Sequence, residues 1–213
     1  MSDYVRPAIR DEVFRDPAGR VIQYGDRWKG ESPPLDTYSV EANLDRFAPL
    51  HAVADALIEH LCSRYLVEAQ DDIAHAGGLL ARRTDVIRAV RLAPADPDGA
   101  PLTFVYTSYP SMWLLAGVLA EFPFPTCSCE ACDETWSTQV EQLEWSALVV
   151  AAGGFAERVR FGSGGFFGYS LQNFEGGRSG ETTLDGFPLD RAQAAKARLD
   201  ALPDGWKRWP DKA

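Results

Sequence analysis

Three segments with helical periodicity constrain the fold most strongly. In residues 49–67, apolar side chains recur at the three- and four-residue spacing of an amphipathic helix, and Pro49 suits its first turn. Residues 133–152 repeat this spacing and end at Gly153-Gly154. A third helix is predicted for residues 189–202, before Pro203. Each helix must bury its apolar face against another element.

Short strand-like runs lie between the predicted helices. Residues 86–92 and 102–108 are rich in β-branched and aromatic side chains, and a Pro- and Gly-containing turn joins them into a hairpin. Further strands are predicted at residues 112–120, 155–161, 166–174 and 182–184. The order of elements predicts one α+β domain, mainly an antiparallel sheet of about five strands with three helices packed on it.

The N-terminal segment has a different character. Proline and glycine interrupt every possible helix in residues 1–45, although the aromatic content is too high for a free tail. We expect an extended arm that wraps the core and carries a short hairpin near residues 14–24. The predicted division is therefore an arm (1–45), a core (46–202) and a tail (203–213) within a single domain, 1–213.

Composition limits the classes of function. The 213-residue chain carries a formal net charge of −10, which disfavours nucleic acid and anionic membrane as partners. No apolar run approaches the roughly 20 residues that a membrane-spanning helix needs, and the first residues do not read as a secretion signal. We expect a cytoplasmic protein, and the excess of arginine over lysine suggests a bacterial source.

Three of the four cysteines fall within six residues. Cys127, Cys129 and Cys132 form a C-x-C-x-x-C cluster. In a reducing compartment, clustered cysteines more often bind metal or react than form structural disulfides. Zinc is the usual partner of thiolates in tetrahedral geometry. The cluster therefore predicts a zinc site with these three residues as ligands.

Electrostatics points the same way. Glu130, Asp133 and Glu134 lie beside the cysteines, so deprotonated thiols and carboxylates would repel one another. We also expect Cys132 to sit at the start of the helix beginning near Asp133, where the helix dipole favours a thiolate. A bound cation would resolve the repulsion.

The fourth ligand stays open. The candidates are Cys62, a histidine (His51, His60 or His75), Asp133, Glu134, water or a partner chain. Cys62 and His51 lie roughly 16 Å apart along the first predicted helix, so they cannot both reach one ion.

Three functional interpretations follow. The leading one is a small domain held together by structural zinc, which acts by binding a protein or small ligand and has no assigned catalytic residue. A zinc ion with an open fourth position would instead suit a hydrolase, with Glu134 as the nearby carboxylate. A thiol/disulfide redox protein would use Cys129 and Cys132 as its C-x-x-C pair.

Several segments resemble an uncharacterised bacterial family of unknown function (DUF6226-like). The most specific is the C-x-C-x-x-C-D-E segment, Cys127 to Glu134, with Phe122-Pro123-Phe124-Pro125 before it. Ala152-Gly153-Gly154-Phe155 and Leu202-Pro203-Asp204-Gly205-Trp206 also match, as does the stretch from Arg88 to Val105. No activity is assigned to that family. The resemblance implies only a stand-alone domain built around the cysteine segment.

Overall fold

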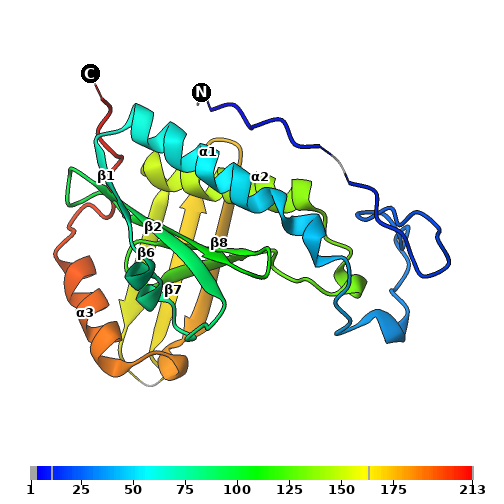
Figure 1. Cartoon of the computed structure of the whole chain (residues 1–213). Coiled ribbons are helices and arrows are strands. Elements are labelled where there is room, and N and C mark those ends of the chain that lie inside the picture. The colour runs from blue at the N-terminus through cyan, green and yellow to red at the C-terminus, as the bar shows by residue number, and fades with distance from the viewer. Residues whose placement is uncertain (1–3, 11, 163, 213) are drawn as a thin grey trace.

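The structure is a computed structural model that describes residues 4–10, 12–162 and 164–212. Residues 1–3 and 11 of the predicted arm, residue 163 of the predicted core and residue 213 of the predicted tail lie outside the described residues. Within the described ranges the chain forms three α-helices and eight strands (Figure 1). This architecture confirms the α+β fold in a single domain, and all strand pairs are antiparallel.

The helices are α1 (Pro49–Arg64), α2 (Trp136–Ala151) and α3 (Leu189–Asp200). Helix α1 has Pro49 in its first turn, as predicted, and buries one apolar face. Helix α2 begins three residues after the predicted Asp133, because that residue has a left-handed φ of 53°. Thr135 is the N-cap instead, and its hydroxyl accepts a hydrogen bond from the Thr138 amide at 3.2 Å.

Five strands form the larger sheet, in the order β1-β2-β3-β4-β5. Their bounds are β1 Val67–Asp71, β2 Val86–Pro94, β3 Leu102–Thr107, β4 Met112–Ala116 and β5 Ala120–Phe124. The predicted hairpin is β2–β3. The strand predicted over residues 112–120 ends at Ala116, and a turn in which Gly117 has a φ of +62° leads into β5. Strand β1 has no alternating apolar pattern, so the sequence did not distinguish it.

Both faces of this sheet are covered. One face carries alternate apolar residues such as Phe104, Leu114 and Phe122, which pack with the buried faces of α1 and α2 into the main core. A smaller cluster of Leu79, Ala89 and Val105 lies apart from that core. Every residue of β3 is buried, because this strand is central and covered on both sides.

The last three strands form a second antiparallel sheet in the order β6-β7-β8. They are β6 (Phe155–Arg160), β7 (Phe166–Gln172) and β8 (Gly177–Thr183). Helix α2 contacts α1, β7 and the strands β4 and β5, so it joins the two sheets. At this junction the rings of Phe122 and Tyr169 meet edge to face, with centroids 5.0 Å apart. Helix α3 packs against β6.

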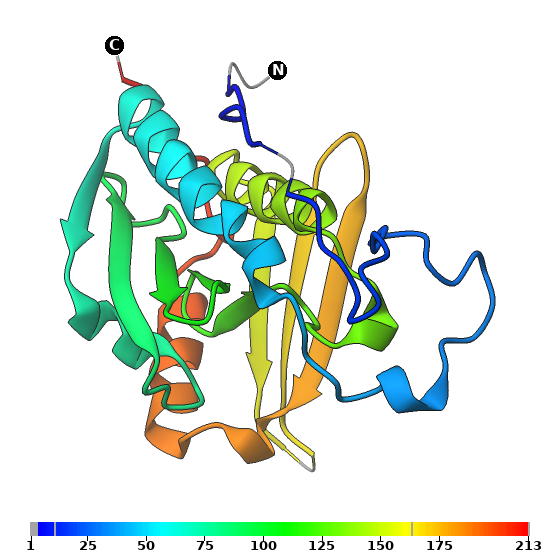
Figure 2. The same cartoon turned by 45° about the vertical axis from the view of Figure 1, so that its right-hand side comes forward.

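Two terminal segments pack onto this framework. The N-terminal segment, blue in Figure 2, runs beside the green turn that connects β5 to α2. A bridge between Arg15 and Val21 closes a short hairpin in it. At the other end, Trp206 and Trp209 are buried, and the Trp209 indole donates to the Ala100 carbonyl at 2.8 Å. The division into arm, core and tail stays a prediction.

None of the helices in the described part of the chain has the length and apolar character needed to cross a membrane.

Candidate metal centre

The three clustered cysteines lie in the connection between β5 and α2. Cys127 Sγ is 3.3 Å from Cys129 Sγ, which is 3.4 Å from Cys132 Sγ. All three sulfur atoms lie within 4.8 Å of one another. A one-turn 3-10 helix, Glu130–Cys132, brings Cys132 back toward Cys129. The described cysteines are all free thiols, so this three-cysteine group can share one metal ion.

Main-chain donors favour a thiolate at the central cysteine. Burial alone would raise the pKa of Cys129, but hydrogen bonds from Cys127 and from the amides of Cys132 and Ser39 lower this pKa to about 7. Sulfur bonded in this way by N–H groups suits a metal ligand, because such bonds stabilise the charged form and fix its orientation. The Cys132 thiol instead keeps its proton in hydrogen bonds to Cys127 and Cys129, and these bonds together with burial raise the pKa of Cys132 to about 12 in the ion-free cluster.

The neighbouring carboxylates are neutralised by arginine. Arg27 Nε donates to Asp133 Oδ1 at 2.5 Å, and its NH1 pairs with Glu130 Oε2 at 2.6 Å. The amides of Gly25 and Arg27 also donate to Asp133 Oδ2. The predicted repulsion among the thiols and the carboxylates of Glu130, Asp133 and Glu134 is therefore smaller than expected, because Glu130 and Asp133 are already paired with an arginine. Their compensating charge comes from the N-terminal segment, and only the crowding of the three sulfur atoms still favours an ion.

A second arginine holds the cysteine loop. Arg46, which is 2% exposed, donates from NH2 to the Ser128 carbonyl at 2.9 Å and from Nε to the Glu134 carbonyl at 3.3 Å. Its NH1 lies 3.6 Å from Glu130 Oε1. One guanidinium group thus fixes the main chain within the cluster, at Ser128, and just after it, at Glu134.

The candidate fourth ligands do not join the cluster. Among the described residues, the group within 4.8 Å consists of the three cysteines alone. Cys62 lies in the last turn of α1, where its carbonyl accepts a hydrogen bond from Lys212 at 2.5 Å. Asp133 is occupied by Arg27. Glu134 Oε2 accepts a hydrogen bond from the Cys127 amide at 3.3 Å, and burial raises the pKa of its carboxyl group.

The histidines also lie outside the group. His51 Nε2 is 3.0 Å from the Ser111 carbonyl, and the ring of His60 packs edge to face on Tyr4. Cys132 is exposed. A water molecule can therefore reach the cysteine cluster as the fourth ligand of a metal ion.

Sequence reasoning missed the residues that support the cluster. Arg27, Arg46 and Ser39 come from the N-terminal third, about 80 to 110 positions before the cysteines. The only signal was the unusual aromatic content around Tyr24 and Trp28. In the structure the Tyr24 hydroxyl donates to Glu130 at 2.8 Å, and the Trp28 indole donates to the Ala131 carbonyl at 3.0 Å.

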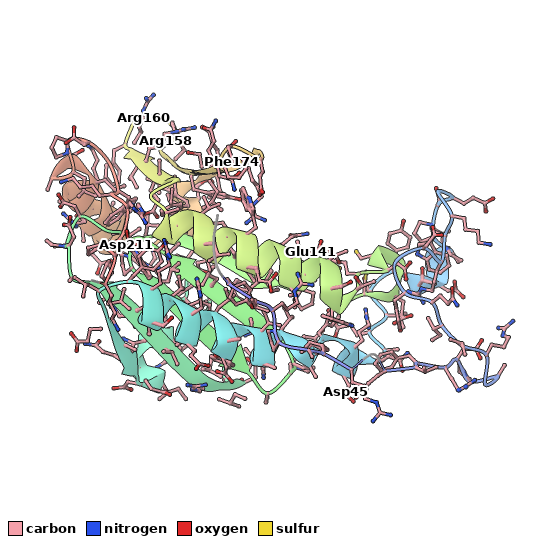
Figure 3. The ribbon with its side chains drawn as sticks, turned by 90° about the horizontal axis from the view of Figure 1, so that it is seen from above. Asp45, Glu141, Arg158, Arg160, Phe174 and Asp211 are labelled. Carbon is pink, nitrogen blue, oxygen red and sulfur yellow. The ribbon has the colours of Figure 1, made fainter. Side chains whose placement is uncertain are left out.

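Figure 3 shows the molecule from above, with the blue N-terminal segment and the green cysteine turn together at one end. The labelled residues Arg158, Arg160 and Phe174 lie on the opposite side of α2 from α1. Arg158 and Arg160 are exposed, so they form a solvated face of the second sheet and do not contribute to the centre.

Comparison with curated proteins and with solved structures gave no significant match. The sequence profile of a family of unknown function, DUF6226, matches residues 10–213. This match covers the strands, the helices, the cysteine cluster and the supporting arginines. The chain belongs to this family of unknown function, DUF6226.

Proposed function

We propose that Cys127, Cys129 and Cys132 bind one zinc ion with a structural role, and that the domain acts by binding a protein or small ligand. The observation that carries this proposal is the convergence of three free thiols, with every pair of sulfur atoms within 4.8 Å. Thiolate is the ligand that zinc prefers in tetrahedral structural sites. A water molecule or a partner's side chain completes the coordination at the exposed side of Cys132.

The ion would join segments that are distant in sequence. Cys127 follows β5, Cys132 precedes α2, and Cys129 receives a hydrogen bond from Ser39 of the N-terminal segment. Zinc binding in small structural sites has an apparent free energy of order 10 kcal/mol, comparable with the total stability of a domain. The ion would therefore stabilise this end of the molecule more than any other single contact there.

Elemental analysis tests the proposal directly. We expect protein purified without a metal-affinity tag to contain about one zinc ion per chain, and Cys129→Ser to contain almost none. Cys62→Ser is the matched control, because it removes a thiol far from the cluster. Equal zinc content in wild type and Cys129→Ser would exclude the site.

A thiol/disulfide redox protein is the second candidate. The pKa of Cys129 near 7 beside the much higher pKa of Cys132 is typical of a C-x-x-C pair with one attacking thiol. The Cys129 thiolate would attack a partner's disulfide, and Cys132 would then resolve the mixed disulfide. The partner leaves with two thiols, and Cys129–Cys132 becomes the disulfide.

The pH dependence of alkylation separates the two candidates. A zinc-bound cluster resists iodoacetamide across neutral pH until a chelator removes the ion. A metal-free redox pair reacts fastest at Cys129, with a rate midpoint near pH 7. Mass spectrometry of the modified peptide identifies the reacting cysteine in either case.

A further inference from the structure

A pocket beside the cysteine loop is lined by one of the three proposed metal ligands, Cys127, but not by the other two. Its volume is about 510 Å³, and it lies where β4 begins and β5 ends, between Tyr109, Trp113, Glu41 and the loop residue Cys127. This volume falls in the range of sites for small organic ligands. The wall combines aromatic rings with a few polar groups, which is the composition expected of a binding site rather than a packing defect.

One polar group of this wall is poorly satisfied. The Tyr109 hydroxyl is buried and has no hydrogen bond of normal geometry with a described residue, although the Ser128 side chain is close enough to interact with it. A buried hydroxyl without a partner is unfavourable by about 1–3 kcal/mol, and such groups in native proteins usually meet a ligand or an ordered water. A tyrosine hydroxyl can both donate and accept a hydrogen bond.

The charge of the wall selects the ligand. Arg83 is matched by Asp85, to which its Nε and NH2 donate at 2.9 and 2.7 Å. Glu41 accepts a hydrogen bond from the neutral Ser128 hydroxyl and forms no ion pair with another described residue. The wall therefore carries one uncompensated negative charge, on a chain whose net charge is −10. This charge favours a cation over an anion.

The aromatic residues fit the same ligand. The guanidinium of Arg83 lies 5.6 Å from the centroid of the Trp113 ring, so one cation already uses this ring, and Tyr109 provides a second aromatic surface at the pocket. Organic ammonium groups bind to aromatic faces with a nearby carboxylate. We propose that this pocket binds a small aromatic or aliphatic amine in its ammonium form, with Glu41 facing the charge and Tyr109 accepting an N–H hydrogen bond.

Four probes test the proposal on the full-length protein: benzylamine, benzyltrimethylammonium, benzyl alcohol and benzoate. Amide chemical-shift titration gives both the affinity and the location of each probe. We expect the two cations to bind at the pocket, with shifts at Trp113 and around Cys127, and benzoate to bind at least tenfold more weakly. Benzyl alcohol measures how much affinity the ring alone provides.

Two variants separate the contributions of charge and hydroxyl. Glu41→Gln keeps the size of an exposed side chain, and we expect it to weaken both cations about fivefold. Tyr109→Phe should weaken benzylamine about fivefold but leave benzyltrimethylammonium unchanged, because the quaternary cation has no N–H to donate. Glu59→Gln, an exposed change on α1 away from the pocket, is the matched control.

Three results would overturn the proposal. The first is that benzoate binds as tightly as the two cations, and the second is that Glu41→Gln binds the cations as tightly as wild type does. The third is that no probe shifts the amide signals of the pocket, which would leave water as the partner of Tyr109. The spectrum of each variant shows whether it is folded. The zinc content is measured separately, so failure of the metal site does not affect this test.

Discussion

Arg27 and Asp133 are joined at two points across 106 positions of sequence. The guanidinium Nε donates to Oδ1 at 2.5 Å, and the main-chain N–H of the same arginine donates to Oδ2 at 2.8 Å. The two side chains are 16% and 7% exposed. This double contact fixes the N-terminal segment against the cysteine turn without requiring a metal ion.

Arg27→Ala should destabilise the protein by about 3 kcal/mol, because it leaves Glu130 and Asp133 largely buried without their main cation. Urea denaturation with Arg10→Ala as the control measures the difference. Arg10 is exposed in the same N-terminal segment, so its variant should lose less than about 0.5 kcal/mol. Similar stability of the two variants would mean that the N-terminal segment adds little to the folded state.

Removal of the proposed zinc ion should expose the N-terminal segment to protease. Ser39 contacts Cys129, so loss of the ion loosens the chain on both sides of this contact. We expect a chelator to increase the rate of tryptic cleavage after the exposed Lys29 about tenfold. This change corresponds to a decrease of about 1.4 kcal/mol in the free energy of local opening. Mass spectrometry of the fragments identifies the cleavage site.

Untreated Cys129→Ser should be cleaved as fast as chelated wild type, whereas Cys62→Ser should match untreated wild type. If chelator leaves the cleavage rate unchanged in a protein that has lost its zinc, the ion does not hold this segment.

The sequence predicted those parts of the fold that depend on local pattern. The helices and the β2–β3 hairpin follow from periodicity and turn residues, because each buries one face. The start of α2 was misplaced because the left-handed conformation of Asp133 is set by its contacts with the N-terminal segment. The second sheet was not distinguished, since its separation depends on long-range packing such as that of Phe122 on Tyr169.

In the candidate site, too, only the features that depend on local sequence could be predicted. The three cysteines are close in sequence, so their convergence could be predicted from spacing alone. The charges around them could not, because Arg27 and Arg46 are remote in sequence and nothing near either residue marks its partner. Counting only the adjacent Glu130 and Asp133 therefore overestimated the repulsion.

Gly117→Ala should be among the most destabilising single changes. Its φ is +62°, and a Cβ here would lie 1.9 Å from Glu157 Oε2. We expect a loss of at least about 3 kcal/mol from strain and displacement of the carboxylate. Gly205→Ala is the control, because its φ is +72° but nothing lies within 4 Å of the added carbon. The free energy of unfolding of Gly205→Ala should decrease by only about 1–2 kcal/mol. Equal decreases in the two variants would show that the contact with Glu157 contributes nothing.

Glu157 should make stability depend on pH. Its carboxylate joins the sheets by accepting hydrogen bonds from the amides of Val118, Leu119 and Ala120 and from the Trp206 indole. Burial nevertheless outweighs these donors and raises the pKa of Glu157 from 4.5 to about 6.

A folded-state pKa above the unfolded value means that the folded protein binds the proton more tightly. The contribution of Glu157 is therefore fully present below about pH 4.5 and is lost as the pH rises through 6, by at most about 2 kcal/mol. The Glu157→Gln variant has no titrating group at this position. The side-chain NH2 of the new glutamine would face the N–H donors that now bond to the carboxylate, so we expect the variant to be less stable than wild type at every pH. Only wild type loses this contribution as the pH rises. The difference in free energy of unfolding between wild type and Glu157→Gln should therefore decrease by up to about 2 kcal/mol between pH 4.5 and 7. Urea denaturation across this range measures the gap, and a gap that is constant or widens would show that the four donors, rather than burial, dominate the pKa.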